Sequence, residues 1–273
     1  MSKIQITSEK ISNESNISIS YKVQGIGYPT LLMHGLGANN RQILSTFSAT
    51  NARIWSPDLP GHGHSDNFQN AYCFAKFKEI MIAFLDSLQI EKVILGGISM
   101  GSGIAINMAE SLSDRVAGLI ICRPAWLDKQ RPDNLQIISD IGNWLQNKTL
   151  EQAKFELSRN LQFQDLLKTN PNCAASIEAS INDRFSNQTH SVLSQMIEGR
   201  AFEDLENLNH LNMPTFITAN ENDPIHPVSI AKKISMNIRN SQFHILPSRY
   251  LEPKKHQREL TNKLNNFLGS NNF

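Results

Sequence analysis

Short apolar runs recur along the chain and alternate with longer segments in which apolar residues follow a helical spacing. The first run, residues 16–23, alternates apolar and polar positions, which predicts a strand with one buried face. Later runs are mostly apolar and often end at Gly, Pro or Asp, as strands buried on both faces of a parallel sheet do. Six of them are predicted as strands: residues 30–35, 52–58, 92–97, 116–122, 214–220 and 241–247.

Segments between several of these runs have the pattern of amphipathic helices. In residues 72–89 the apolar positions recur at intervals of three and four: Phe74, Phe77, Ile80, Met81, Phe84 and Leu88. Strands that alternate with helices indicate an α/β fold with right-handed crossovers. We therefore predict a mostly parallel, doubly wound sheet, in one domain that spans residues 1–273.

One segment, residues 123–208, breaks this alternation because it has helical periodicity and no convincing strand. Such an insertion predicts a helical lid over the carboxyl ends of the strands, where α/β sheets bind ligands. The alternative is a small helical bundle that has no role at the site. Four helices are predicted, from the stripe Leu135, Ile138, Ile141 and Leu145, a capping box of Thr149 with Gln152, the stripe Ala174, Ile177, Ile181 and Phe185, and the stripe Val192, Met196 and Ile197.

Composition narrows the class of protein. Hydrophobic residues make up 40% of the 273 positions and charged residues 19%, as in ordinary globular domains. A net charge of +1 without a Lys/Arg block gives no sign of a nucleic-acid partner. Residues 1–18 lack the apolar core of a signal peptide, and no run is long enough to span a membrane. We expect a soluble, cytoplasmic protein with no membrane partner, whose three cysteines are core thiols.

The stretch "GGISMGSG", residues 96–103, stands where a predicted strand turns into a predicted helix. Residues 97–101 read G-x-S-x-G, with Ser99 at the centre. A sharp strand-to-helix turn strains its central residue and exposes that side chain, and a Cβ two residues before or after would clash across the turn. We therefore predict that Ser99 is a nucleophile, with the positive end of a helix dipole beside it.

Further motifs flank this turn. "HGLG" (residues 34–37) and "DLPGHGHSD" (58–66) follow two early strands, "RPAWL" (123–127) opens the helical segment, and "NENDPIHP" (220–227) follows a late strand. With the serine turn, these motifs resemble the α/β-hydrolase fold superfamily, specifically its lidded, esterase-like members with a nucleophilic serine. The resemblance covers nearly the whole chain outside the lid. It implies an oxyanion loop at residues 34–37, an acid loop at residues 220–227 and no cofactor.

Attack by a serine creates an oxyanion, which needs donors already in place. The amide of Met100, next to the nucleophile, is one expected donor, and the resemblance implies that the amide of Leu36 is the other. The polar residues of the early loops are expected to shape those loops; an alternative metal role matches no ligand spacing, so we predict no metal site. These residues are His34, Asp58, His62, His64 and Asp66.

The serine also needs a base that is oriented by a carboxylate. Asp223 follows a strand and precedes Pro224, the place of the acid in the resembled superfamily, with Glu221 as its rival. The superfamily usually has a Gly-His pair after the last strand, whereas this chain has "SRYLEPKKHQREL". His256 preserves the order serine, aspartate, histidine, and we predict it as the base; the alternatives are His226 in the acid loop and His244 inside a strand.

The predicted activity is hydrolysis of a carboxylic ester, thioester or lactone of a small molecule through an acyl-enzyme. Alternatives are C–C bond hydrolysis or peroxidation on the same triad, or ligand binding on a hydrolase scaffold. Trp126 and Trp144 are candidate substrate-binding residues for an apolar acyl or alcohol group, although helices also need such residues to pack.

Overall fold

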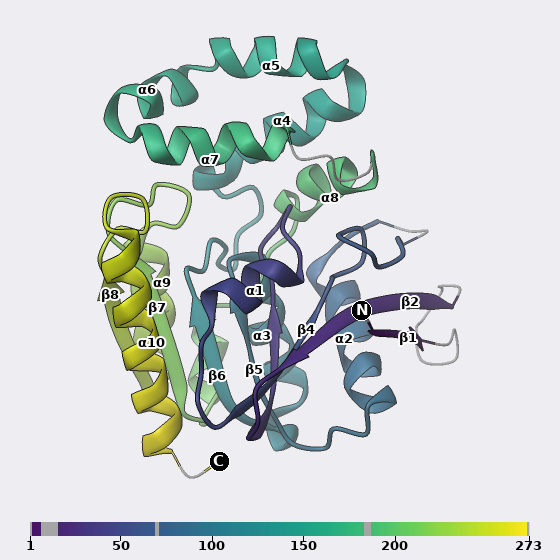
Figure 1. Cartoon of the computed structure of the whole chain (residues 1–273), viewed down its shortest axis with the longest axis vertical. Helices are drawn as coiled ribbons and strands as arrows, with labels where there is room; N and C mark the ends of the chain where they lie inside the picture. Colours follow the sequence, from purple (N-terminus) through teal and green to yellow (C-terminus); the bar gives the residue numbers. More distant parts are fainter. Residues whose placement is uncertain (1, 7–15, 69–70, 183–186, 272) are drawn as a thin grey trace.

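A computed structural model describes residues 2–6, 16–68, 71–182, 187–271 and 273. Its centre is an eight-stranded sheet with the strand order β1-β2-β4-β3-β5-β6-β7-β8. Figure 1 shows the sheet with helices packed along it and a helical layer above one end. The strands are β1 (Ser2–Ile6), β2 (Ile17–Gln24), β3 (Tyr28–Met33), β4 (Ala52–Pro57), β5 (Val93–Ile98), β6 (Val116–Cys122), β7 (Thr215–Asn220) and β8 (Ser241–Leu246).

The sheet is mostly parallel. β2 pairs antiparallel with both β1 and β4, whereas every pair from β4 through β3, β5, β6 and β7 to β8 is parallel. The seven predicted strands and the α/β class are therefore confirmed. β1 was not predicted, since its five residues are mostly exposed and give only a weak alternation.

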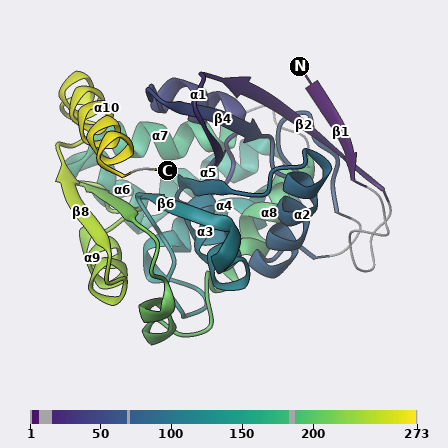
Figure 2. The same ribbon diagram turned by 90° about the horizontal axis from the view of Figure 1, so that it is seen from below.

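Helices cover both faces of the sheet, as the view in Figure 2 makes plain. Along β5, Val93 and Leu95 join one apolar cluster while Ile94 and Ile98 join the other, because successive side chains point to opposite faces. The first cluster includes the helices α2 and α3, and the second includes α1 and α10. The helices that flank the sheet are α1 (Asn40–Thr46), α2 (Phe74–Ser87), α3 (Met100–Ser111), α9 (Val228–Asn237) and α10 (Pro253–Ser270).

Five α-helices lie between β6 and β7 in the described part of the chain, all within the predicted insertion, and none of the described residues of that insertion is in a strand. The capping box is present, since Thr149 and Gln152 exchange both hydrogen bonds at the start of α5. Four helices were predicted, and α6 was missed; Phe185 lies outside the described residues. The helices are α4 (Gln136–Asn147), α5 (Leu150–Arg159), α6 (Leu161–Thr169), α7 (Pro171–Asn182) and α8 (Asn187–Ile197).

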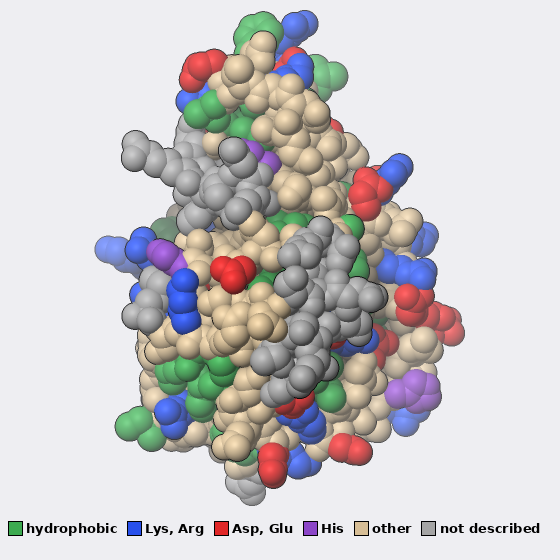
Figure 3. All heavy atoms as spheres, turned by 90° about the vertical axis from the view of Figure 1, so that its right-hand side faces the viewer, with side chains coloured by type: hydrophobic (Ala, Val, Ile, Leu, Met, Phe, Trp, Pro, Cys, Tyr) green, Lys and Arg blue, Asp and Glu red, His purple; other side chains and the backbone are tan. Residues whose placement is uncertain are grey.

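Charged side chains of both signs are mixed on the one face of the molecule that Figure 3 shows, where Lys and Arg side chains are interspersed with Asp and Glu side chains. Within the described part of the chain, every helix is too short or too polar to cross a bilayer.

Candidate active site

Ser99 lies at the sharp turn between β5 and α3 and has a φ of 56° and a ψ of −112°. Residues with a side chain rarely adopt this region, so the turn is strained. A Cβ on Gly97 would lie 2.5 Å from the Met33 carbonyl oxygen, and one on Gly101 would lie 2.1 Å from the same atom. The predicted reason for both glycines is therefore confirmed.

Hydrogen bonds fasten this turn to the neighbouring strand. The Ser99 amide donates to the Cys122 carbonyl at the end of β6 over 3.0 Å. The Ser102 hydroxyl donates to the Gly97 carbonyl over 2.7 Å and accepts from the Cys122 amide over 3.1 Å. Hydrogen bonds to backbone groups of β5 and β6 thus hold the turn that carries Ser99.

The loop after β3 runs beside Ser99. The Gln42 side chain on α1 accepts a hydrogen bond of 2.8 Å from the Gly35 amide, which fixes the loop. The amides of Leu36 and Met100 donate to no other group among the described residues, and Leu36 lines the same cavity as Ser99. Both amides therefore remain available to an oxyanion.

His34 and His62 brace this loop. Each ring donates from Nδ1 to a backbone carbonyl, while Nε2 of His34 accepts from the Leu59 amide and Nε2 of His62 from the Gly37 amide. Burial lowers the pKa of His34 to about 4 and that of His62 to about 3, so both rings stay neutral. The expectation that they shape the loop is confirmed.

The carboxylates of these early loops accept backbone hydrogen bonds. Asp58 accepts from the Asn40 and His64 amides, and Asp66 accepts from the Ser18 amide. Within the described residues, no three His, Cys, Asp or Glu side chains come together in a way that could hold a metal.

Asp223 lies in the loop after β7, and its side chain is completely buried. The preceding residue, Asn222, has a φ of 52°, in the left-handed region. The rival Glu221 is exposed. Of the two carboxylates, only Asp223 is positioned to orient a buried histidine.

The histidine on Asp223 is His226, not the predicted His256. Its Nδ1 lies 3.0 Å from Asp223 Oδ1, so that Nδ1–H donates to the carboxylate, while Nε2 has no hydrogen-bond partner among the described residues. His256 instead donates from Nδ1 to the Pro247 carbonyl over 3.1 Å, and His244 packs against the Phe216 ring. His226 and Ser99 line one cavity, whose lining does not include His256.

Burial and charge set the pKa values of this pair. Burial lowers the pKa of His226; Asp223 opposes this shift, while the positive charges of Arg123 and Arg249 add to it. Burial of Asp223 by itself raises its pKa, but His226 and the two arginines outweigh it and hold that pKa below its ordinary value. At neutral pH the site therefore contains an ionised aspartate and a neutral histidine, which is the state that a base requires.

The cavity has a volume of about 140 Å³. The insertion forms part of its wall through Leu135 just before α4, Ile138 on α4 and Ile177 on α7. Trp126 lines it and is almost fully buried, whereas Trp144 packs against the same apolar cluster but is not among the residues that line the cavity. The two candidate tryptophans are therefore not equivalent.

Two arginines that sequence analysis did not select also line the cavity. Arg123 directly follows β6, and Arg249 lies in the loop after β8, where the resembled superfamily usually has the Gly-His pair. Arg249 Nε is 3.6 Å from Asp223 Oδ2, and its guanidinium lies over the Tyr250 ring. The signal for His226 was the spacing of three residues from Asp223 with Pro224 between them, which a tight turn can bring into contact.

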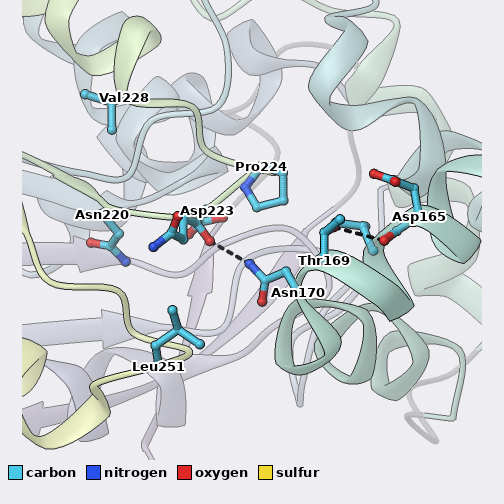
Figure 4. A pocket seen from close by; sticks show the side chains of 10 residues that line it. Asp165, Thr169, Asn170, Asn220, Asp223, Pro224, Val228 and Leu251 are labelled. Carbon is cyan, nitrogen blue, oxygen red and sulfur yellow. Dashed lines mark hydrogen bonds between the residues drawn. The ribbon is translucent and has the colours of Figure 1, made fainter.

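A larger hollow of about 480 Å³ lies on the other side of Asp223. Figure 4 shows Asn220, Asp223 and Pro224 on one side of it and Asn170 with Thr169 on the other. Ser99 and His226 do not line this hollow, so it lacks the proposed reacting groups. It is bridged by Asn170, whose amide donates to the Asn222 carbonyl over 2.8 Å and joins the insertion to the acid loop.

A family profile described as the alpha/beta hydrolase fold matches residues 28–248, which is most of the chain. The chain belongs to this family. The match includes Ser99, Asp223 and His226 but ends before His256.

Individual relatives are distant. The chain is 24% identical, over 81% of its length and 79% of the relative's, to a 2-hydroxymuconate semialdehyde hydrolase of Pseudomonas sp. (strain CF600). Among solved structures it is similar to a malate-bound thermophilic esterase from Thermogutta terrifontis, with a TM-score of 0.74, 22% identity and all of both chains covered. It is also similar to an enol-lactonase from Burkholderia xenovorans LB400, with a TM-score of 0.70, 15% identity and 95% and 98% of the two chains covered.

Proposed function

We propose that the protein is a serine hydrolase that cleaves a carboxylic ester, or a related acyl bond such as a thioester or lactone, of a small molecule. The observation that carries the proposal is the shared cavity of Ser99 and His226, in which His226 Nδ1 is bonded to Asp223. In this scheme His226 Nε2 takes the proton of the Ser99 hydroxyl as the oxygen attacks the acyl carbon. His226 replaces His256 as the proposed base.

The remaining groups have roles in the same scheme. The amides of Leu36 and Met100 stabilise the oxyanion, and Asp223 keeps the His226 ring in the correct tautomer and stabilises its charged form. The protonated His226 then gives that proton to the leaving alcohol oxygen as its bond to the acyl carbon breaks, which leaves the acyl group as an ester on Ser99. A water that gives a proton to His226 attacks this ester, and the acid product leaves as Ser99 recovers the proton. Residues 123–208 act as a lid, since Trp126, Leu135 and Ile177 come from this segment and line the cavity.

Covalent labelling tests the proposal. A fluorophosphonate probe should label Ser99, and a panel of p-nitrophenyl esters should be turned over with a preference for short acyl groups, because the cavity is small. A folded protein that neither reacts with the probe nor turns over any ester of the panel would contradict the proposal and favour a binding protein.

Cleavage of a C–C bond on the same three residues is a second candidate, favoured by the similarity to the Pseudomonas hydrolase over about four fifths of the chain. An assay with 2-hydroxymuconate semialdehyde compared with the ester panel separates the two. Faster turnover of the semialdehyde than of every ester would favour the second candidate.

A further inference from the structure

The cavity beside Ser99 carries more positive than negative charge. Arg123 and Arg249 line it, and none of the described residues that line it is Asp or Glu. Within the described chain, the carboxylate that influences both guanidinium groups is Asp223, which lies behind the cavity wall. Since His226 is neutral, two positive charges share one negative charge.

Arg123 is the less compensated of the two arginines. Its exposed fraction is 7%, and its guanidinium makes no hydrogen bond and no ion pair within 4.0 Å to any described residue. Burial and the nearby Arg249 lower its pKa to about 10, which leaves it protonated at neutral pH. A buried charge without a partner is unfavourable. The charge of Arg123 would therefore be stabilised by an anion that enters the cavity.

The Arg249 guanidinium, unlike that of Arg123, already has partners within the protein. One of its terminal nitrogens donates to the Tyr250 hydroxyl over 2.6 Å, and its Nε faces Asp223. The loop that carries it is tied to the insertion, because the Asn172 amide donates to the Tyr250 carbonyl over 2.8 Å. Arg249 can therefore support an anion in the cavity, while Arg123 is free to bind it.

The backbone directs Arg123 to this place. Immediately after β6 it takes a φ of 49°, and its amide donates to the Thr218 carbonyl over 2.8 Å. On the adjacent strand Ser99 has a φ of 56°. Ser99 and Arg123 thus both have a positive φ, lie at the ends of neighbouring strands and line one cavity. Strained backbone of this kind is concentrated at functional sites, which indicates that the two residues belong to one site.

We infer that Arg123, supported by Arg249, binds a carboxylate group of the substrate beside the bond that Ser99 attacks. The inference rests on the proposed function and specifies its substrate class as short esters that carry a free carboxylate, such as a monoester of a dicarboxylic acid. A guanidinium pairs with a carboxylate through two parallel hydrogen bonds. One excess positive charge in a cavity of about 140 Å³ matches a small monoanion better than a phosphate dianion.

Binding to a Ser99→Ala variant tests this substrate class without turnover. Monomethyl succinate, which carries one carboxylate, is compared by calorimetry with neutral dimethyl succinate and with inorganic phosphate. We expect monomethyl succinate to bind about 10- to 100-fold more tightly than dimethyl succinate, the range of a charged hydrogen-bonded contact. Equal affinity for the two esters, or tighter binding of phosphate, would overturn the inference.

Variants then assign the anion site to the arginine. Arg123→Gln, added to Ser99→Ala, should abolish the preference for monomethyl succinate, and Arg123→Lys should retain part of it. Arg239→Gln, which removes one positive charge from an exposed position outside the cavity, should leave the preference intact. If Arg123→Gln does not fold, Arg249→Gln takes its place and should reduce the preference several-fold; a preference of undiminished size in the folded variant contradicts the inference.

Turnover separates this inference from the proposed function. The protein with Ser99 intact should cleave mono-p-nitrophenyl succinate faster than p-nitrophenyl methyl succinate, in the same ratio by which it binds anion over neutral ligand. If neither ester is cleaved while the Arg123-dependent binding preference is present, the hydrolase proposal fails and the anion site stands. If both are cleaved equally well, the proposed function stands and the anion site fails.

Discussion

The side of the cavity with the proposed nucleophile, Ser99, and the side with the proposed acid–base pair, Asp223 and His226, are built in different ways; they are called the nucleophile side and the acid–base side below. On the nucleophile side, Ser99 lies between two glycines, and a Cβ added to either of them would collide with the β3 backbone. On the acid–base side, one carboxylate, Asp223, faces both a histidine and an arginine from two separate loops. Close backbone contacts determine the geometry of the first side. On the second side, the geometry depends on which side chains pair with the Asp223 carboxylate.

This difference affects how each side tolerates change. Steric contact through backbone atoms leaves a single arrangement, because a clash of 2.1 Å cannot be relieved by a rotamer. When a polar residue near Asp223 is replaced, another side chain can bond to the carboxylate in its place, because a carboxylate accepts hydrogen bonds from several directions. We therefore expect glycine substitutions on the first side to lower stability, and substitutions around Asp223 to change its contacts and the pKa of His226.

The largest loss is expected when the nucleophile itself is removed. Ser99→Ala should abolish probe labelling and lower kcat on the order of 10⁴- to 10⁶-fold without unfolding the protein. Ser176→Ala removes another serine hydroxyl from the same cavity and is the matched control, which should still be labelled. A covalent adduct on Ser99→Ala, located by mass spectrometry, would show that the nucleophile side has been misassigned.

A matched pair of histidine variants tests the acid–base side. His226→Asn keeps a donor toward Asp223 but removes Nε2, and should lower kcat/KM about 10²- to 10⁴-fold. His256→Asn keeps a donor toward Pro247 and should change kcat/KM by less than about tenfold, since its ring does not line the cavity. The reverse ranking in steady-state kinetics would restore His256 as the base.

The steric argument for the nucleophile side is tested through stability. Gly101→Ala places a Cβ 2.1 Å from the Met33 carbonyl oxygen and should lower the free energy of unfolding by about 3 kcal/mol or more. Gly269→Ala, in α10 with nothing within 4 Å, should raise it by up to about 1 kcal/mol. Equal denaturant midpoints for the two variants would contradict the steric account of this turn.

The sequence predicted the turn at Ser99 better than the partner of Asp223, because only the turn depends on local residues. The turn at Ser99 follows from local sterics, so a glycine pattern between a strand and a helix was sufficient to locate it. The proposed base depends on which histidine reaches Asp223 in three dimensions. Chain order favoured His256, which lies thirty residues after the His226 that contacts Asp223. Arg123 was part of a quoted motif, but nothing in the sequence indicated that a left-handed backbone would direct it into the cavity.

The pH dependence of turnover reports the charges around His226. Because burial and the arginines lower its pKa, the ring loses its proton below pH 6.5, and the acidic limb of kcat/KM should lie below that value. Arg249→Gln removes a positive charge that disfavours the protonated ring, so the pKa should rise and the limb should move to higher pH. A limb that does not move, or moves to lower pH, would mean that another group controls it.

The smallest effect is expected from the tryptophans, which differ in their relation to the cavity. Trp126 is 2% exposed, packs edge-on against Phe74 and lines the cavity, so Trp126→Phe should change the ratio of kcat/KM between acetyl and butyryl esters several-fold. Trp144 packs on the apolar cluster outside the cavity, and Trp144→Phe should lower stability by about 1 kcal/mol while that ratio stays constant. The measurement is the selectivity ratio beside the melting temperature of each variant. A ratio that shifts only in proportion to the melting temperature in both variants would remove Trp126 from the substrate-binding residues and leave it a packing role in the insertion.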